Sequence, residues 1–235
     1  MIKGCVTMGI FACVLTLCLG GAPPAGADLG PLLDSLRAVG PQGAGHRKAA
    51  EAWQQLVQAD SAQLPQILSA LDQANPLAAN WIRTAVDAIA ERHLQRGTAL
   101  PEAQLARFVE DLRHDGRARR LAFEWLVRVD PSARGRLLGP RGSKMLNDPS
   151  LELRREALLC LIEEAQKLQK QDRANEATAL YWQGLTAARD PDQIRLLADR
   201  LRKLGQTVDL PRPVSYTHLR AHETPEHLVC RLLLE

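Results

Sequence analysis

The stretch DPSLELRREALLCLI, residues 148 to 162, combines the features of a helix start with those of an amphipathic helix. Asp148 places an acidic side chain where it can cap the first turn, and Pro149 suits that turn because its φ is fixed and it has no N–H. Leu153, Ala157 and Leu161 then recur every four residues, which is the spacing of one helix face. The stretch therefore predicts a helix that begins near residue 150 and buries one apolar face.

The same features recur along most of the chain. Asn75-Pro76, Asp130-Pro131 and Asp190-Pro191 also place a capping side chain before a proline, and Gly97 and Gly205 stand where a left-handed helix C-terminus favours glycine. No stretch of the sequence shows the alternation of a half-buried strand. Short connections make successive helices antiparallel neighbours. We expect helices near residues 31–39, 46–59, 62–74, 76–96, 101–113, 116–129, 131–146 (interrupted at Gly139-Pro140), 150–171, 174–189 and 191–204.

The quoted stretch also has counterparts earlier in the chain. Successive counterparts lie 35 to 37 positions apart and share a small residue that is followed four positions later by a large one: Ala49 and Trp53, Ala85 and Ile89, Ala122 and Leu126, Ala157 and Leu161. A small residue beside a large one lets adjacent repeats approach closely and interlock. A period of this length that carries two helices indicates an all-α fold, an α-solenoid of about four to five antiparallel helix pairs.

The stretch resembles the second helix of a HEAT-like repeat, in which Asp-Pro opens the helix, an arginine follows, and an alanine with aliphatic residues faces the stack. Arg154-Arg155 supplies the arginine, and Arg119-Arg120 stands in the same place one repeat earlier, where Asp115-Gly116 replaces Asp-Pro. The resemblance covers about residues 45 to 168. Residues 166 to 205 are more similar to a tetratricopeptide (TPR) helix pair. The resemblance implies a HEAT/armadillo/TPR-like helical repeat domain.

The N-terminus has the pattern of a secretory signal peptide. Lys3 precedes an uncharged run, and Ala25-Gly26-Ala27 supplies the small residues that signal peptidase requires. We expect cleavage after Ala27, which leaves residues 28 to 205 as an exported repeat domain, periplasmic or extracellular, without a membrane span. The alternative is an uncleaved anchor, for which the apolar run is short. A lipoprotein signal is disfavoured because the residue before Cys18 should be small and is leucine.

The C-terminal end has two parts. Residues 206 to 213 are polar and contain proline, and we expect them to be a linker to a missing downstream domain. Residues 214 to 235 resemble translated sequencing-adaptor read-through. Val214 to Thr224 and Leu228 to Glu235 match the two ends of a common transposase adaptor in one reading frame, on either side of a variable index. We expect this tail to be non-native; the alternative is a native amphipathic tail.

Composition and cysteine usage exclude several classes of protein. Of the 235 residues, 46% are hydrophobic and 24% charged, and the net charge is +3, which describes a globular chain with no basic character that would favour nucleic acid. Cys5, Cys13 and Cys18 lie in the signal and Cys230 in the tail. The repeat domain keeps only Cys160, so we expect no internal disulfide and no cysteine-based metal site.

The sequence contains no convincing catalytic motif. Gly40 to Arg47 superficially resembles a phosphate-binding loop, but His46 stands where lysine is required and Arg47 where serine or threonine is required. His93 and His114 have no second metal ligand at helical spacing, and neither a nucleophile elbow nor a zinc-binding His-Glu motif occurs. We expect no catalytic residue, cofactor or metal, and therefore no enzyme.

Two sets of side chains are candidates for partner binding. Four arginines crowd one predicted turn and either bind an acidic partner or cap helices and pair with acidic residues between repeats: Arg113, Arg117, Arg119 and Arg120. Four tryptophans either line a concave binding face or anchor the repeats: Trp53, Trp81, Trp125 and Trp182. We expect a non-catalytic interaction or scaffold module that binds another protein or its own downstream domain. The alternative is a helical accessory segment of a truncated exported enzyme.

Overall fold

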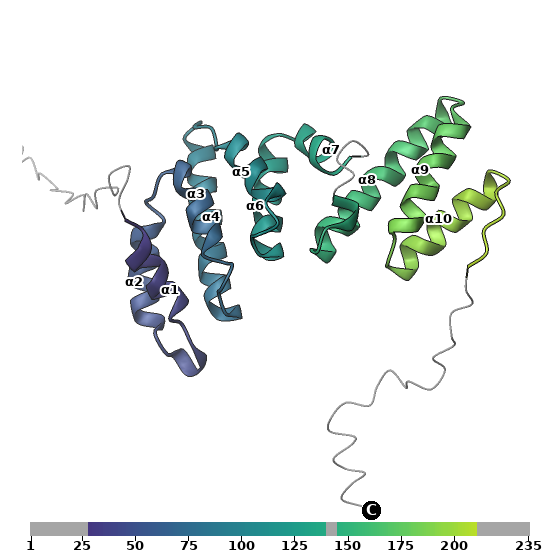
Figure 1. Cartoon of the computed structure of the whole chain (residues 1–235). Helices are drawn as coiled ribbons and strands as arrows, with labels where there is room; N and C mark the ends of the chain where they lie inside the picture. Colours follow the sequence, from purple (N-terminus) through teal and green to yellow (C-terminus); the bar gives the residue numbers. More distant parts are fainter. Residues whose placement is uncertain (1–27, 140–144, 211–235) are drawn as a thin grey trace, which may run out of the picture. The chain divides into compact units, whose positions relative to one another are not determined.

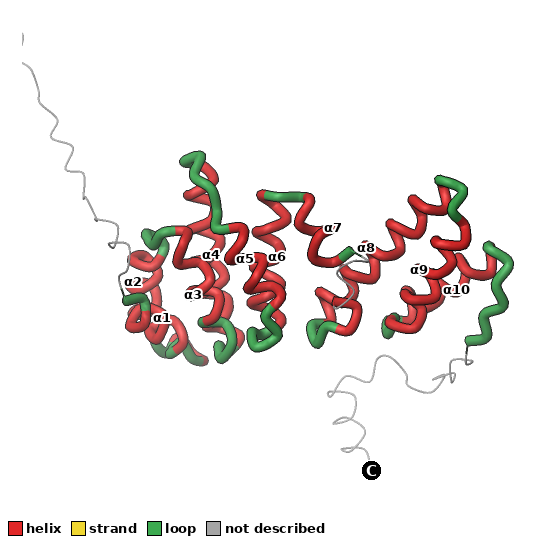
Figure 2. The backbone as a smooth tube through the Cα atoms, turned by 45° about the horizontal axis from the view of Figure 1, so that its top comes forward, coloured by secondary structure: helices red, strands yellow, loops and turns green. Residues whose placement is uncertain are grey.

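The computed structural model describes residues 28 to 139 and 145 to 210, which form an all-α fold of neighbouring, packed helices (Figures 1 and 2). No strand occurs among these residues. The ten α-helices in the described part are α1 (Gly30–Arg37), α2 (His46–Leu56), α3 (Leu64–Ser69), α4 (Pro76–Gln95), α5 (Glu102–Glu110), α6 (Gly116–Val129), α7 (Ser132–Leu138), α8 (Leu151–Lys170), α9 (Ala174–Ala187) and α10 (Pro191–Lys203). The predicted signal peptide, the end of the predicted linker and the predicted tail lie outside the described residues.

The helices belong to two compact units, and the boundary between the units falls inside α8. In the first unit, which ends at Leu161, α1 contacts α2 and α4, and α3 contacts α4, α5 and α6. Contacts therefore run within each helix pair and on to the next pair, as in a solenoid. In the second unit, which begins at Ile162, α9 packs against α10, and Tyr181 and Leu197 are fully buried.

Burial follows the predicted repeat register. The equivalent alanines of α2, α4, α6 and α8 are fully buried: Ala49, Ala85, Ala122 and Ala157. Of the large residues four positions later, Ile89, Leu126 and Leu161 are buried, whereas Trp53 is half-buried. The packing is compatible with a helical repeat in which small side chains allow close approach of neighbouring helices.

The predicted caps are only partly confirmed: Asn75 caps α4, whereas Asp190 stands at the start of α10 without a side-chain cap hydrogen bond. The Asn75 side chain accepts two backbone hydrogen bonds at the start of α4, and Asp130 and Asp148 each accept one from the N–H two residues further on. Gly97 and Gly205 have φ values of +70° and +76°, in the left-handed region that glycine adopts without strain. Local sequence signals thus mark the start of α4 and the turns that follow α4 and α10.

Two predicted helices are wrong at their C-terminal ends. The helix expected over residues 62–74 starts as the 3₁₀ turn Ser61–Gln63 and continues as α3. It ends at Ser69 because the next three N–H groups, of residues 70 to 72, bond to carbonyls three residues back, in the 3₁₀ pattern. The helix expected over residues 131–146 ends at Leu138. Gly139 is extended, with ψ at 174°, because a residue before proline is driven out of the helical region. The other helices end within three residues of their predicted bounds.

Candidate partner-binding groove

Arg119, one of the four arginines near the start of α6, is fully buried. Its guanidinium donates hydrogen bonds to both carboxylate oxygens of Asp148, at 3.0 and 2.5 Å, and to the backbone oxygen of Val109 at 2.7 Å. Asp148 is buried as well. Arg119 thus takes the structural role that the sequence left as an alternative: it ties the end of α5 to the turn before α8.

Arg113 and Arg117 each fold back onto a nearby aspartate. The Arg113 side chain is 88% exposed, and its hydrogen bonds to Asp111 lower the pKa of that carboxyl well below its usual range. Arg117 pairs with Asp115 at 3.1 Å and also donates to the backbone oxygen of Ala74. Partial burial raises the pKa of Asp115, but the hydrogen bonds from Arg117 outweigh it, so the pKa is lowered.

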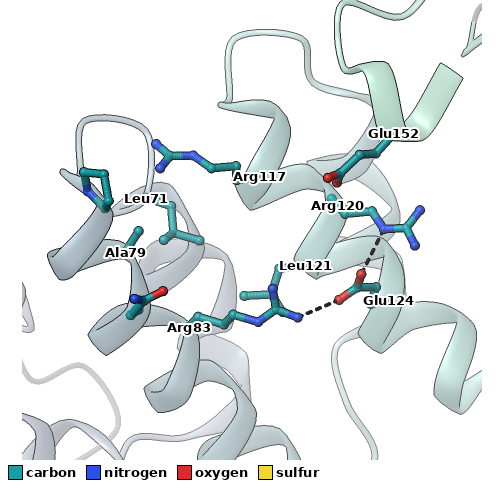
Figure 3. A pocket seen from close by; sticks show the side chains of 10 residues that line it. Leu71, Ala79, Arg83, Arg117, Arg120, Leu121, Glu124 and Glu152 are labelled. Carbon is teal, nitrogen blue, oxygen red and sulfur yellow. Dashed lines mark hydrogen bonds and ion pairs between the residues drawn. The ribbon is translucent and has the colours of Figure 1, made fainter. Parts of the chain in front are cut away.

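Arg117 and Arg120 line a pocket of about 380 Å³ between the turn after α3, α4, α6 and the first turn of α8 (Figure 3). We call it the arginine pocket. Three of its lining residues are arginines and two are glutamates, and the rest are apolar apart from one asparagine: Leu71, Pro76, Ala79, Asn80, Arg83, Arg117, Arg120, Leu121, Glu124 and Glu152.

Glu124 is shared by two guanidiniums. Arg83 reaches from α4 to Glu124 with an Nη2–Oε2 distance of 3.2 Å, and Arg120 pairs with Glu124 on α6 with an Nε–Oε1 distance of 2.9 Å (Figure 3). The Arg83 side chain is 58% exposed, so its attraction to Glu124 is screened by water. The pocket has no excess of positive charge, because Arg117 also pairs with Asp115 and Arg83 also lies 4.0 Å from Asp87.

The arginines of this surface follow the repeat register. Each of three successive second helices of a pair has an arginine and, four residues later, an acidic partner at 2.9 to 4.0 Å: Arg47 and Glu51 in α2, Arg83 and Asp87 in α4, Arg120 and Glu124 in α6. The arginines are 36 and 37 positions apart. The sequence analysis did not identify Arg83 or Glu124 as candidates. The offset of 37 that relates Ala85 to Ala122 also relates Arg83 to Arg120 and Asp87 to Glu124.

A second, more open pocket of about 300 Å³ adjoins the arginine pocket at Asn80, which lines both. We call it the tryptophan pocket, and we call the two together the groove. Besides Asn80, the tryptophan pocket is lined by residues of α2 and α4: His46, Leu77, Trp81 and Thr84. The Trp81 and His46 rings meet edge to face, with centroids 6.1 Å apart, and Leu77 is 40% exposed. This pocket offers an apolar surface.

The four tryptophans have different roles. Trp125 is buried and its Nε1 donates to Asp87 at 2.8 Å, as expected for an anchor between repeats. Trp53 is half-buried, and its Nε1 donates to the Thr84 hydroxyl at 3.1 Å. Trp81 lines the groove, and Trp182, in the second unit, is 37% exposed.

The histidines of the described residues make structural contacts. His93 is buried, with Nδ1 at 2.9 Å from the Thr98 hydroxyl. His114 pairs with Asp72 at 2.8 Å and stacks on Phe108. Within residues 28–139 and 145–210, no group of three or more histidines, cysteines and acidic residues is placed to hold a metal ion. Among the same residues, no helix combines the length and apolar character needed to span a membrane.

Comparisons with known proteins identified no relative. No protein-family model matches the chain, and neither the curated proteins nor the solved structures gave a significant match. The function is therefore inferred from the residues of the groove.

Proposed function

We propose that the chain is a non-catalytic, HEAT-like repeat module of an exported protein, and that it binds a partner protein along the groove. Export rests on the signal-peptide pattern of the sequence. The HEAT-like assignment is supported by the Arg119–Asp148 pair, because the aspartate that opens one repeat holds the arginine of the previous repeat. The last helix pair, α9 and α10, is TPR-like in its sequence pattern.

The observation that carries the binding proposal is the groove, which crosses successive repeats. The tryptophan pocket lies between α2 and α4, and the arginine pocket lies mainly between α4 and α6. Stacked repeats expose long surfaces of this kind, on which a partner chain contacts several repeats at once. Aromatic and arginine side chains supply most of the affinity of protein interfaces. Both are present in the groove.

A peptide-display selection against the immobilised full chain tests the proposal. We expect enriched peptides to bind the wild-type chain and to bind at least about tenfold more weakly to the double variant Arg83→Gln/Arg120→Gln, because each arginine offers a charge-assisted contact. Arg113→Gln is the matched control, since Arg113 is an exposed arginine outside the groove. Selection of no peptide, or equal binding to the double variant, would contradict the proposal.

A further inference from the structure

We infer that the junction between the first two helix pairs is sensitive to pH: protonation of the His93 side chain releases Arg92 from the backbone of the turn that follows α2. Arg92 and His93 lie near the end of α4, and the turn consists of residues 57 to 59. We call the hydrogen bonds from Arg92 to this turn the Arg92 contact. The inference concerns the conformation of the repeat stack and is independent of the proposed partner binding.

The Arg92 contact holds three consecutive residues of the turn. Nη1 of Arg92 donates to the backbone oxygen of Val57 and, at 3.3 Å, to Oε1 of Gln58, and Nη2 donates to the backbone oxygen of Ala59. Val57 directly follows the last residue of α2, so the guanidinium binds carbonyls that the end of a helix leaves unpaired. The Arg92 Nε is buried and has no hydrogen-bond partner among the described residues. The two Nη groups therefore make the whole contact.

Neighbouring hydrogen bonds determine which nitrogen of the neutral His93 ring carries the proton. The Thr98 hydroxyl has one proton and donates it to the backbone oxygen of His93 at 2.8 Å. The His93 Nδ1 lies 2.9 Å from the same hydroxyl, so Nδ1 carries the proton and donates to it. Nε2 is then the unprotonated nitrogen. It lies 3.4 Å from Nη2 of Arg92 and accepts from the guanidinium.

A proton from solvent therefore binds at Nε2, the ring nitrogen that faces Arg92. Nε2 changes from an acceptor to a donor, and the ring and the guanidinium become two adjacent cations. The Ala59 backbone oxygen accepts from Arg92 in the neutral state and is also within hydrogen-bond reach of the His93 ring. The protonated ring thus takes this acceptor from Arg92, while repulsion between the two cations displaces the guanidinium.

The surroundings of His93 place this change below neutral pH. Burial lowers the pKa of His93 most, followed by Arg92; Asp60 in the turn after α2 raises it, and Arg96 on α4 lowers it. Arginine stays protonated throughout, so the histidine is the group that titrates. The Arg92 contact is therefore intact above about pH 6.5, the ordinary pKa of histidine, and is lost as the pH falls through a pKa below that value.

A different side chain connects the same two helix pairs at the start of α4. The Asn75 side-chain nitrogen donates to the backbone oxygen of Val39, in the turn after α1, at 2.8 Å. An amide does not titrate in this pH range. The two turns should therefore respond differently: the turn after α2 loses its partner at low pH, whereas the turn after α1 keeps it.

Hydrogen exchange with mass spectrometry on the full chain tests the inference over a pH series from about 7.5 to about 4.5, with labelling times scaled to the intrinsic exchange rate. The amides of residues 57–59 and of the control residues 38–40 are all hydrogen-bonded in the fold. We expect protection of residues 57–59 to fall about tenfold as His93 titrates, the effect of losing one charge-assisted hydrogen bond, and protection of residues 38–40 to stay constant. His93→Gln should abolish the fall. His114→Gln, the same change at a histidine that pairs with Asp72, should preserve it.

Nitrogen-15 NMR of the histidine-labelled full chain measures the proton position without any change of sequence in the tested protein. The signals of His93 are those that disappear in His93→Gln. We expect a protonated Nδ1 and an unprotonated Nε2 at about pH 7.5. Arg92→Gln should raise the pKa of His93, because a nearby cation is removed, and should leave residues 57–59 weakly protected at every pH. A proton on Nε2, an equal fall of protection in both turns, or a fall that persists in His93→Gln would each overturn the inference.

Discussion

Arg119 and Arg120 are adjacent in the sequence, yet they lie in opposite environments. Arg119 is fully buried and makes a two-point contact with the buried Asp148, whereas Arg120 is half-buried and pairs with Glu124 in the arginine pocket. Successive residues of a helix point about 100° apart, which sends one guanidinium into the core and the next into the arginine pocket. A buried charge requires its partner, whereas an exposed pair adds little stability. The first arginine therefore holds the fold, and the second is available for binding.

The largest expected effect is that of Asp148→Asn. The amide has almost the same shape as the carboxylate but leaves the Arg119 cation without a counter-charge in the core. Removing one partner of a buried ion pair costs about 3–5 kcal/mol. We expect the free energy of unfolding to fall by that amount, measured by urea unfolding with circular dichroism detection. A loss below about 1 kcal/mol would mean that the pair is hydrated and that the contrast with Arg120 is false.

A double variant provides the control for this effect. Arg119→Met with Asp148→Leu removes both charges, and buried pairs replaced by apolar side chains of similar size are often neutral in stability. We expect the double variant to be more stable than Asp148→Asn. Recovery should be incomplete, because Asp148 also accepts the Ser150 N–H and Arg119 donates to the Val109 backbone oxygen. A double variant less stable than the single one would show that packing, not charge, dominates at this site.

Local signals in the sequence were sufficient to predict most of the fold. Asn75 caps α4 and Gly97 ends the turn after it through interactions within a few residues, so the sequence window contains their cause. The repeat of buried alanines identified the helix pairs, because burial against a neighbouring repeat imposes the same small residue each time. The early end of α3 was missed, because nothing between Ala70 and Ala74 is a helix breaker.

The groove could be predicted only in part. Arg117 and Arg120 belonged to the arginine cluster in the sequence, but the cluster does not reveal which guanidinium points inward. Arg83 and Glu152 reach the arginine pocket from helices distant in sequence, so their proximity depends on how the repeats stack. Only the repeat offset between Arg83 and Arg120 could have linked two of these side chains beforehand.

The titration of His93, which is buried beside Arg92, should change the free energy of unfolding with pH, by less than Asp148→Asn changes it. Burial, and then the nearby Arg92, lower the pKa of His93; Arg96 also lowers it, and Asp60 raises it. The neutral ring is favoured in the fold, with Nδ1 bonded to Thr98. The unfolded chain titrates near pH 6.5 and binds more protons below that pH, so this stabilisation is full above about pH 6.5 and is lost at lower pH.

Urea unfolding at about pH 5 and pH 7.5 measures this effect. We expect the wild-type chain to be less stable at the lower pH and the variant His93→Gln to show a weaker pH dependence, because glutamine does not titrate. The variant His114→Gln is a second comparison, since His114 pairs with Asp72 instead of facing an arginine. An unchanged pH dependence in His93→Gln would contradict the assignment.

The smallest effect on stability is expected from Glu124→Gln, the surface counterpart of Asp148→Asn. The chemical change is the same, but the Glu124 side chain is 38% exposed, so the free energy of unfolding should change by less than about 1 kcal/mol. Binding should change in the opposite direction from the arginine variants. Removing this carboxylate leaves Arg83 and Arg120 without their shared partner, so a display-selected peptide that places a carboxylate on these guanidiniums should bind about threefold more tightly, with a steeper dependence on salt. Weaker binding would mean that Glu124 is needed to position the guanidiniums of Arg83 and Arg120. A loss of stability equal to that of Asp148→Asn would remove the distinction between Arg119 and Arg120.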